Sequence, residues 1–201
     1  MPDPVWTMRY QMNQTPEGNG FTRSFDYTLQ AIVTEVTGGS PANRRVELDA
    51  RAGLDCGVVF LTSTVPSLDF TQGATAETIV NVSGDSNGNA GIELTFLSYA
   101  VALQVYPGKV KLYAPGDGNP DPSVDVTVPT ASNNADIKWR ITFDTLHQVH
   151  IYRDDLLVIG PVVVPIVVKP FQRVLWWAEG GVLTIWRAFR FYVGGAVPAG
   201  N

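Results

Sequence analysis

Aromatic and arginine side chains near the carboxyl end of the chain have the chemistry to hold a sugar. Trp176 and Trp177 are adjacent, so on a strand one must face the core and the other the opposite surface. Trp186, Arg190 and Tyr192 share one parity of the next segment. The opposite parity is apolar at Leu183, Ile185, Phe189 and Phe191. If that apolar parity is the core, the other three side chains lie outside, where aromatic rings stack on sugars and arginine donates to hydroxyl groups. A protein interface or a covered sheet face is the alternative.

Arg140, His150 and Tyr152 extend this candidate surface. Arg140 stands on the parity opposite to the apolar residues of its segment. His150 and Tyr152 share a parity opposite to their apolar neighbours, and we expect them on a solvent or groove face. We therefore predict a sugar-binding or partner-binding surface from the following candidates: Trp186, Arg190, Tyr192, Trp176, Trp177, Arg140, His150 and Tyr152.

Metal ligands and nucleophiles are the other chemistry to consider. His147 and His150 are three residues apart, so on a strand they face opposite sides and do not share a metal. No serine or cysteine can be assigned to a catalytic triad with them. Residues 85–91 and 117–121 offer oxygen ligands at alternate positions, which suits calcium, but turn formation explains both loops better. We predict no metal and no other cofactor, with calcium as the alternative.

Period-two alternation of apolar and polar residues recurs from end to end, and no segment carries a helical apolar stripe. Three turns separate alternating runs: 84–89, where Asn87-Gly88 tolerates positive φ, Pro107-Gly108, and Asp154-Asp155. We count about a dozen strands at a spacing typical of sandwiches. The pattern predicts one all-β, two-sheet antiparallel domain over residues 1–201, with its core at about 5–195.

Charge and hydropathy exclude several classes of partner. The 201-residue chain has a formal net charge of −5 and no block of lysine or arginine, which argues against nucleic acid. The longest apolar stretch, 156–168, contains Gly160, Pro161 and Pro165 and is too short and too broken to span a bilayer. The first residues lack the basic and then apolar pattern of a signal peptide. We predict neither nucleic-acid binding nor membrane insertion.

The order of the strands in the second half carries a family resemblance. It runs through alternating segments at 101–105, 109–113 and 139–143 to a unit at 149–158, in which Tyr152 precedes the turn and apolar residues follow it. This order resembles the concanavalin A-like lectin and glucanase superfamily, in its laminin-G-like jelly-roll form. The opening, with Trp6, Pro16, Gly20 and Phe21, resembles bacterial and phage members. Asp155 departs from the family, which usually has glycine there.

The resemblance implies a two-sheet jelly-roll β-sandwich and allows catalysis to be tested. The hydrolase branch carries Glu-x-Asp-x-x-Glu on one strand, which places two carboxyl groups about 5–5.5 Å apart for retaining cleavage. Glu47-Leu48-Asp49 begins this pattern, but Arg51, Ala52 and Gly53 follow it, and no second glutamate is near. We therefore expect no enzymatic activity.

Three functions remain open at this point. The first hypothesis is a structural or attachment module, namely a phage virion component such as a capsid decoration, tail or fibre protein. The alternative is a carbohydrate-binding module of a secreted or cell-surface protein, and a degenerate glycoside hydrolase is weaker. The partners expected are proteins in an assembly or a glycan, with a homo-oligomer allowed, at the virion or the extracellular surface.

Overall fold

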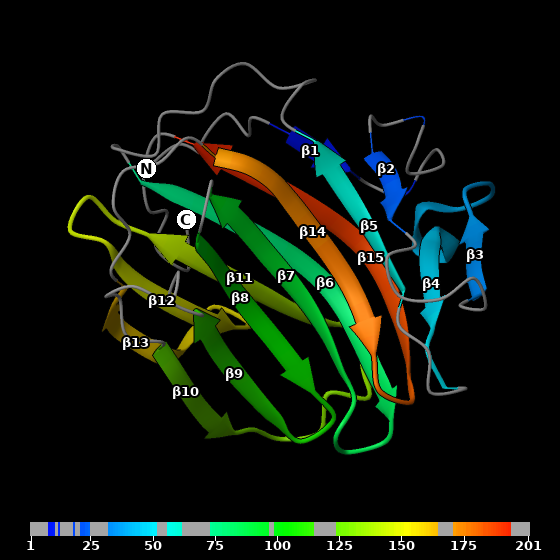
Figure 1. The fold of residues 1–201 in the computed structure, drawn as a ribbon. Coiled ribbons are helices and arrows are strands. Elements are labelled where there is room, and N and C mark those ends of the chain that lie inside the picture. The colour runs from blue at the N-terminus through cyan, green and yellow to red at the C-terminus, as the bar shows by residue number, and fades with distance from the viewer. Residues whose placement is uncertain are drawn as a thin grey trace.

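A computed structural model gives the architecture of the chain. It describes residues 8–10, 12, 18, 21–24, 32–51, 56–61, 73–96, 99–114, 124–164 and 171–193. Within these ranges the chain forms two antiparallel sheets, one of eight and one of seven strands. In Figure 1, β7, β8, β9, β10 and β14 lie in front of β6, β11, β12, β13 and β15. The all-β, two-sheet sandwich is thus confirmed.

The eight-stranded sheet has the order β13-β12-β11-β6-β15-β4-β3, with β1 paired to β15. Its strands are β1 (Met8–Tyr10), β3 (Ile32–Val36), β4 (Arg45–Asp49), β6 (Ala74–Gly84), β11 (Ile137–Phe143), β12 (Gln148–Arg153), β13 (Leu156–Val163) and β15 (Val182–Val193). The seven-stranded sheet has the order β10-β9-β8-β7-β14-β5-β2. Its strands are β2 (Phe21–Ser24), β5 (Cys56–Leu61), β7 (Asn89–Phe96), β8 (Tyr99–Tyr106), β9 (Lys109–Ala114), β10 (Val124–Pro129) and β14 (Phe171–Glu179).

Helix is scarce in the part of the chain that the structure describes. The 3-10 helix η2 (Pro41–Asn43) precedes β4, and it is too short to form an α-helical turn of its own. No helix among the described residues has the length and hydrophobicity that a membrane span requires.

The core lies between the two sheets because each strand turns one parity inward. The inward side chains of β6, β11, β7 and β8 are mostly small or branched apolar residues, and most of them are fully buried. Three tryptophans, Trp139, Trp176 and Trp186, are the largest buried side chains in the described part of the chain. Trp176 of one sheet meets Trp186 of the other, with ring centroids 5.1 Å apart and planes tilted by 55°. Such pairs add packing energy beyond the area that they bury.

A β-bulge in β15 reverses the parity of that strand. The pairing with β6 shifts between Trp186 and Ala188, so Arg187 is the extra residue. Before the bulge Trp186 faces the core, and after it Phe189 faces the core. The predicted placement of Trp186 on the outer face is therefore wrong. Leu183 and Ile185, which were expected in the core, lie on the partly exposed parity instead.

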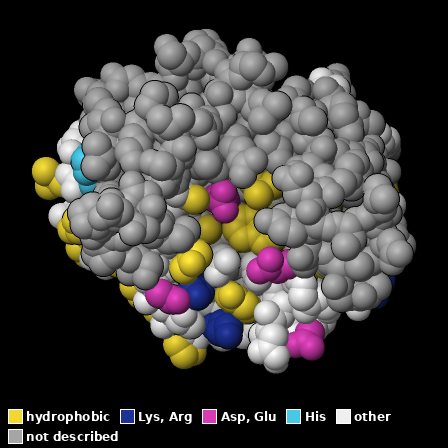
Figure 2. Space-filling model, viewed as in Figure 1, with side chains coloured by type: hydrophobic (Ala, Val, Ile, Leu, Met, Phe, Trp, Pro, Cys, Tyr) yellow, Lys and Arg dark blue, Asp and Glu magenta, His cyan; other side chains and the backbone are white. Residues whose placement is uncertain are grey.

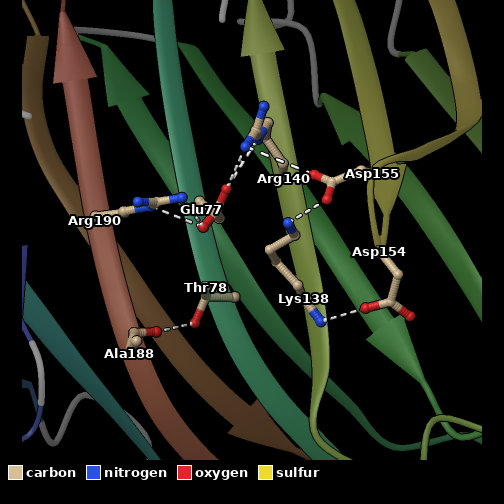
Figure 3. A network of polar contacts seen from close by, with 8 residues as sticks. All are labelled: Glu77, Thr78, Lys138, Arg140, Asp154, Asp155, Ala188 and Arg190. Carbon is tan, nitrogen blue, oxygen red and sulfur yellow. Dashed lines mark hydrogen bonds and ion pairs between the residues drawn. The ribbon is translucent and has the colours of Figure 1, made fainter. Parts of the chain in front are cut away.

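Thr78 stabilises this bulge from the core side. Its hydroxyl donates a hydrogen bond of 2.7 Å to the carbonyl oxygen of Ala188, as Figure 3 shows. A buried carbonyl that loses its donor costs free energy, so the bulge depends on a hydroxyl at this position.

Replacing Thr78 with valine should lower the free energy of unfolding by about 1–3 kcal/mol, because valine keeps the shape but leaves the Ala188 carbonyl without its donor. Urea denaturation followed by circular dichroism measures the change through the midpoint at a constant slope. The control is Thr127→Val on β10, where the side chain is exposed and the effect should stay within about 0.5 kcal/mol. Equal midpoints for the two variants would contradict the role given to Thr78.

Of two predicted turns, one forms as expected and the other differs in detail. Asp154 and Asp155 both adopt left-handed backbone conformations, with φ of 46° and 68°, and join β12 to β13 as predicted. Aspartate tolerates this region better than most residues, so Asp155 can form the turn without a glycine. In the turn between β6 and β7, however, the positive φ belongs to Gly84 and not to Asn87-Gly88. That part of the prediction is wrong.

Candidate functional site

The predicted site residues do not form one surface. Trp176 and Trp186 are 0% and 1% exposed and belong to the core. Trp177 lies partly exposed on the outer face of the seven-stranded sheet, so the opposite orientation predicted for the adjacent tryptophans is confirmed. The remaining candidates lie on the outer face of the eight-stranded sheet: Arg140, His150, Tyr152, Arg190 and Tyr192.

A row of charged residues crosses the eight-stranded sheet at Glu77. The register places Arg190 of β15 and Arg140 of β11 beside Glu77 of β6, and Tyr152 of β12 beside Arg140. Arg140 donates to one carboxylate oxygen of Glu77 from Nε at 2.9 Å and from Nη2 at 2.7 Å. Arg190 donates to the other oxygen from Nε at 2.8 Å (Figure 3).

The ion-pair row of Arg190, Glu77 and Arg140 continues toward the turn at Asp155. The Lys138 ammonium pairs with Asp155, and the second oxygen of that carboxylate lies 3.8 Å from Nη2 of Arg140. The side chains of Arg140 and Glu77 are only 2% and 6% exposed. Arg140 thus neutralises the carboxylate of Glu77, and because its side chain is buried it is poorly placed to contact a ligand from solvent.

Glu77 was missed as a site residue, although its position in β6 contained a signal. It stands between Ala76 and Thr78 on the parity opposite to the core, where an acidic residue in a long strand needs a cation. The strands that supply Arg140 and Arg190 follow 63 and 113 residues later in the chain, so the partners themselves could not be read from the local pattern.

Of the two histidines, His147 takes a different position from that predicted, whereas His150 lies on the partly exposed face beside Tyr152 as expected. His147 lies in the turn before β12, with φ of 60°, and not on a strand. His150 lies on β12 and stacks on Tyr152, with ring centroids 6.3 Å apart and planes at 23°. Among the described residues, no three His, Cys, Asp or Glu side chains form a group that could hold a metal ion.

The loop at 85–91 behaves as a turn. The Asp85 carboxylate accepts a 2.8 Å hydrogen bond from the backbone nitrogen of Asn87, and the Asn89 side chain donates to Glu179 at 2.5 Å. Gly91 lies beneath the ring of Trp177. Asp85 and Asn89 thus make contacts within the protein that belong to the turn. The second candidate loop, 117–121, lies outside the described residues, as do Trp6, Pro16 and Gly20.

The carboxylates of Glu47 and Asp49 are each paired with an arginine on β4 or just after it. Arg45 donates from Nε to Glu47 at 2.5 Å, and Arg51 donates from Nη2 to Asp49 at 2.6 Å. The Arg51 guanidinium lowers the pKa of the Asp49 carboxyl, mainly through this hydrogen bond. The general acid of a glycoside hydrolase needs a raised pKa, so Asp49 does not fit that one role.

A second row crosses the seven-stranded sheet on its outer face. The register places Trp177, Gly91, Gln104 and Lys111 side by side on β14, β7, β8 and β9. The six-membered ring of Trp177 occupies the space above Gly91, because a Cβ added there would lie 2.1 Å from Cη2 of the indole. Only glycine at this position lets the ring lie against the sheet. We call these four residues the Trp177 row.

Tyrosines and lysines surround the Trp177 row. Tyr106 donates to the side-chain oxygen of Gln104 at 3.2 Å, and burial raises the pKa of the Tyr106 phenol, so it stays a donor at neutral pH. The Lys111 ammonium lies 2.7 Å from Asp125 and 4.8 Å from the centre of the Tyr113 ring. Its hydrogen bond with Asp125 raises the pKa of Lys111, which therefore remains a cation.

This face combines apolar and polar groups within reach of one ligand. Figure 2, which has the same viewpoint as Figure 1, shows hydrophobic side chains at its centre with acidic and basic side chains close beside them. An aromatic ring held flat on a sheet, with an amide and an ammonium in the same row, is suited to a ligand with both apolar faces and hydroxyl groups.

Solved structures with this fold include toxin and lectin domains. The botulinum neurotoxin serotype D/C VPI 5993 binding domain gives a TM-score of 0.67 at 10% identity, over 96% of this chain and 50% of that chain. A botulinum neurotoxin type C structure, described as dependent for cell entry on two ganglioside molecules, gives 0.63 at 10% identity, over 90% and 45%. The potassium-bound carbohydrate recognition domain of Emp46p gives 0.62 at 11% identity, over 92% and 94%.

These likenesses establish the fold, and they confirm the lectin-like jelly roll. The chain spans about half the length of the neurotoxin chains and most of the Emp46p domain. No protein-family model matches the chain, and no curated protein matches it in sequence. The laminin-G-like and phage parts of the resemblance stay predictions.

Proposed function

We propose that the chain is a non-enzymatic, lectin-like module that binds a glycan on the Trp177 row. The observation that carries this proposal is the indole of Trp177 lying over Gly91, with Gln104 and Lys111 next to it across the sheet. Tryptophan stacks on the apolar face of a sugar ring, while an amide and an ammonium donate to its hydroxyl groups.

The dimensions of the row favour an oligosaccharide over a single sugar. Neighbouring strands are about 4.8 Å apart and the indole lies over Gly91, so the ring is about two such spacings, or roughly 10 Å, from the backbone of Lys111. A ligand that reaches from the indole to the ammonium must therefore contain more than one ring. Tyr106, which donates to Gln104, fixes the orientation of the amide between them.

The structural neighbours lend this proposal support of a general kind. One is called a carbohydrate recognition domain, and another is described through its interaction with gangliosides. With identities of 10 and 11%, no binding residue can be transferred to this chain. The proposal therefore depends on the Trp177 row itself.

A structural or attachment module, including the phage capsid decoration, tail or fibre protein predicted above, is the second candidate. The observation that favours it lies on β13, the edge strand of the eight-stranded sheet. Leu156, Leu157 and Val163 are 72%, 50% and 64% exposed there. An exposed apolar edge strand favours contact with another protein.

Replacing Trp177 with alanine should weaken glycan binding by roughly 30-fold or more, because truncation of a central aromatic residue costs at least about 2 kcal/mol of binding free energy. A glycan array identifies the ligand, and isothermal titration calorimetry measures the loss. Gly91→Ala should also weaken binding, since its new Cβ displaces the indole. Tyr152→Ala, on the other sheet, is the matched control and should leave binding unchanged.

Two results would contradict the proposal. Loss of glycan binding in Tyr152→Ala but not in Trp177→Ala would move the site to the eight-stranded sheet. A wild-type protein that binds no glycan on the array but associates with itself or with virion shells would favour the second candidate.

A further inference from the structure

A hollow on the outer face of the eight-stranded sheet has the size of a small-molecule site. Its volume is about 570 Å³, within the range of roughly 300–1,000 Å³ that is typical of ligand pockets. Ile79 of β6 and Ala188 of β15, which are paired across the sheet, line it together with Pro41 and Ala42 of η2. These four residues give it an apolar lining.

The β15 bulge brings a guanidinium group to this hollow. Arg187 is the extra residue of the bulge, and both Arg187 and the next residue, Ala188, line the hollow. A bulge is a common device for re-aiming a side chain next to a site. The same irregularity that turns Trp186 into the core therefore also places Arg187 and Ala188 at the hollow.

Arg187 is held in a fixed orientation. Its Nε donates to the Asp136 carboxylate at 3.1 Å, and its Nη1 donates to the carbonyl oxygen of Ala42 at 3.2 Å. These contacts tie β15 to the segment before β11 and to η2. They leave Nη2 without a partner among the described residues, so a ligand finds a guanidinium that is already positioned.

Arg44 adds a second guanidinium to the lining. It donates from Nη2 to the carbonyl oxygen of Gly39 at 3.5 Å, while its buried Nε has no hydrogen-bond partner among the described residues. The guanidinium of Arg44 thus lies at the pocket with few partners of its own. With two arginines and one aspartate, the lining has a formal charge of +2 − 1 = +1.

We infer that this hollow, the Arg187 pocket, binds a small ligand that carries one carboxylate, and we assign it to an acidic sugar. The carboxylate meets the guanidinium groups of Arg187 and Arg44, and the apolar side of the ring lies on Ile79 and Ala188. A phosphate is the poorer fit, because its charge of about −1.5 to −2 at pH 7 would repel Asp136. The choice of a sugar rests on the proposed function, whereas the carboxylate does not.

The test is a calorimetric titration of the whole chain with glucuronate, glucose and inorganic phosphate. Glucuronate should bind at least about tenfold more tightly than glucose, and more tightly than phosphate. Arg187→Gln and Arg44→Gln should each weaken glucuronate binding by roughly 10–100-fold. Lys138→Gln is the matched control: it removes a positive charge from the neighbouring strand outside the pocket and should stay within about twofold of the wild type.

Because Arg187 also tethers η2, Ala188→Leu provides a second variant that fills the pocket without removing a charge. It should abolish glucuronate binding, and thermal unfolding shows whether each variant is folded. The inference is overturned if glucose or phosphate binds as tightly as glucuronate, if Arg44→Gln and Ala188→Leu both bind normally, or if Lys138→Gln loses as much affinity as Arg187→Gln.

The proposals for the Arg187 pocket and for the Trp177 row can be refuted independently of each other. Trp177→Ala should leave glucuronate binding unchanged, since the two sites lie on different sheets. Loss of oligosaccharide binding in Arg187→Gln together with retention in Trp177→Ala would instead refute the proposed function and leave the pocket as the glycan site.

Discussion

Replacing Trp186 with alanine lowers the free energy of unfolding by about 3–5 kcal/mol, the cost of deleting a buried aromatic side chain. Trp186 is 1% exposed and packs on Trp176 across the sandwich, with ring centroids 5.1 Å apart. Its Nε1 donates to the hydroxyl of Thr184 at 2.8 Å, so the variant loses a buried hydrogen bond as well. Urea denaturation followed by circular dichroism measures the loss.

The matched control is Trp177→Ala, nine residues earlier in the chain and partly exposed. It should cost less than half as much stability and yet should weaken glycan binding strongly. If β15 had no bulge, its alternation would place Trp186 on the outer face, and Trp186→Ala would then be stable but would no longer bind the glycan. A Trp186→Ala variant with an unchanged urea midpoint would therefore contradict the bulge and the account of the core.

Alternation of apolar and polar residues was sufficient to predict the fold class. Segments such as Ile137–Phe143 and Gln148–Arg153 alternate as expected, and they pair with each other in the eight-stranded sheet. The orientation of Trp176 and Trp177 followed from adjacency alone, which no register error within β14 can change. These predictions succeed because they need only local geometry.

Trp186 was misplaced because its parity was compared with that of Phe189 and Phe191, which lie after the bulge. The bulge inserts one residue and moves every later side chain to the other face. The sequence around it, Trp186-Arg187-Ala188, contains no glycine that would mark the irregularity. The signal lies on another strand, where Thr78 supplies the hydroxyl that binds the Ala188 carbonyl. A single sequence does not pair these two positions.

The candidate sites escaped prediction for the same reason. Trp177 was identified as a candidate, but the glycine that receives its ring lies on β7 and is chosen by the register of β14 with β7. The Arg187 pocket likewise combines a bulge, a 3-10 helix and the segment before β11. Cross-strand register decides both sites, and it is set by the whole sheet.

The two sheet faces also differ in how their charges are used, which matters for any ligand. In the ion-pair row of Arg190, Glu77 and Arg140, both arginines pair with the Glu77 carboxylate. In the Trp177 row, Lys111 shares its charge with an exposed Asp125 and lies at the edge of an apolar centre. The first arrangement stabilises the sheet, and the second leaves polar groups within reach of a ligand.

Replacing Glu77 with glutamine should lower the free energy of unfolding by about 3–5 kcal/mol, because it removes one partner of a buried ion pair. Arg140, with a side chain that is 2% exposed, would keep its charge and lose the carboxylate that binds it through two nitrogens. Arg190 would lose its 2.8 Å partner as well. Thermal and urea denaturation both measure this loss.

The control for Glu77→Gln is Glu47→Gln, which breaks the more exposed pair with Arg45 and should cost only about 0–1 kcal/mol. A double variant, Glu77→Leu with Arg140→Met, separates the pair from the burial itself. Because an apolar pair avoids the desolvation of two charges, the double variant should regain most of the stability that Glu77→Gln loses. Two results would contradict this account of Glu77: an equal loss of stability in Glu77→Gln and Glu47→Gln, or a double variant that is less stable than Glu77→Gln.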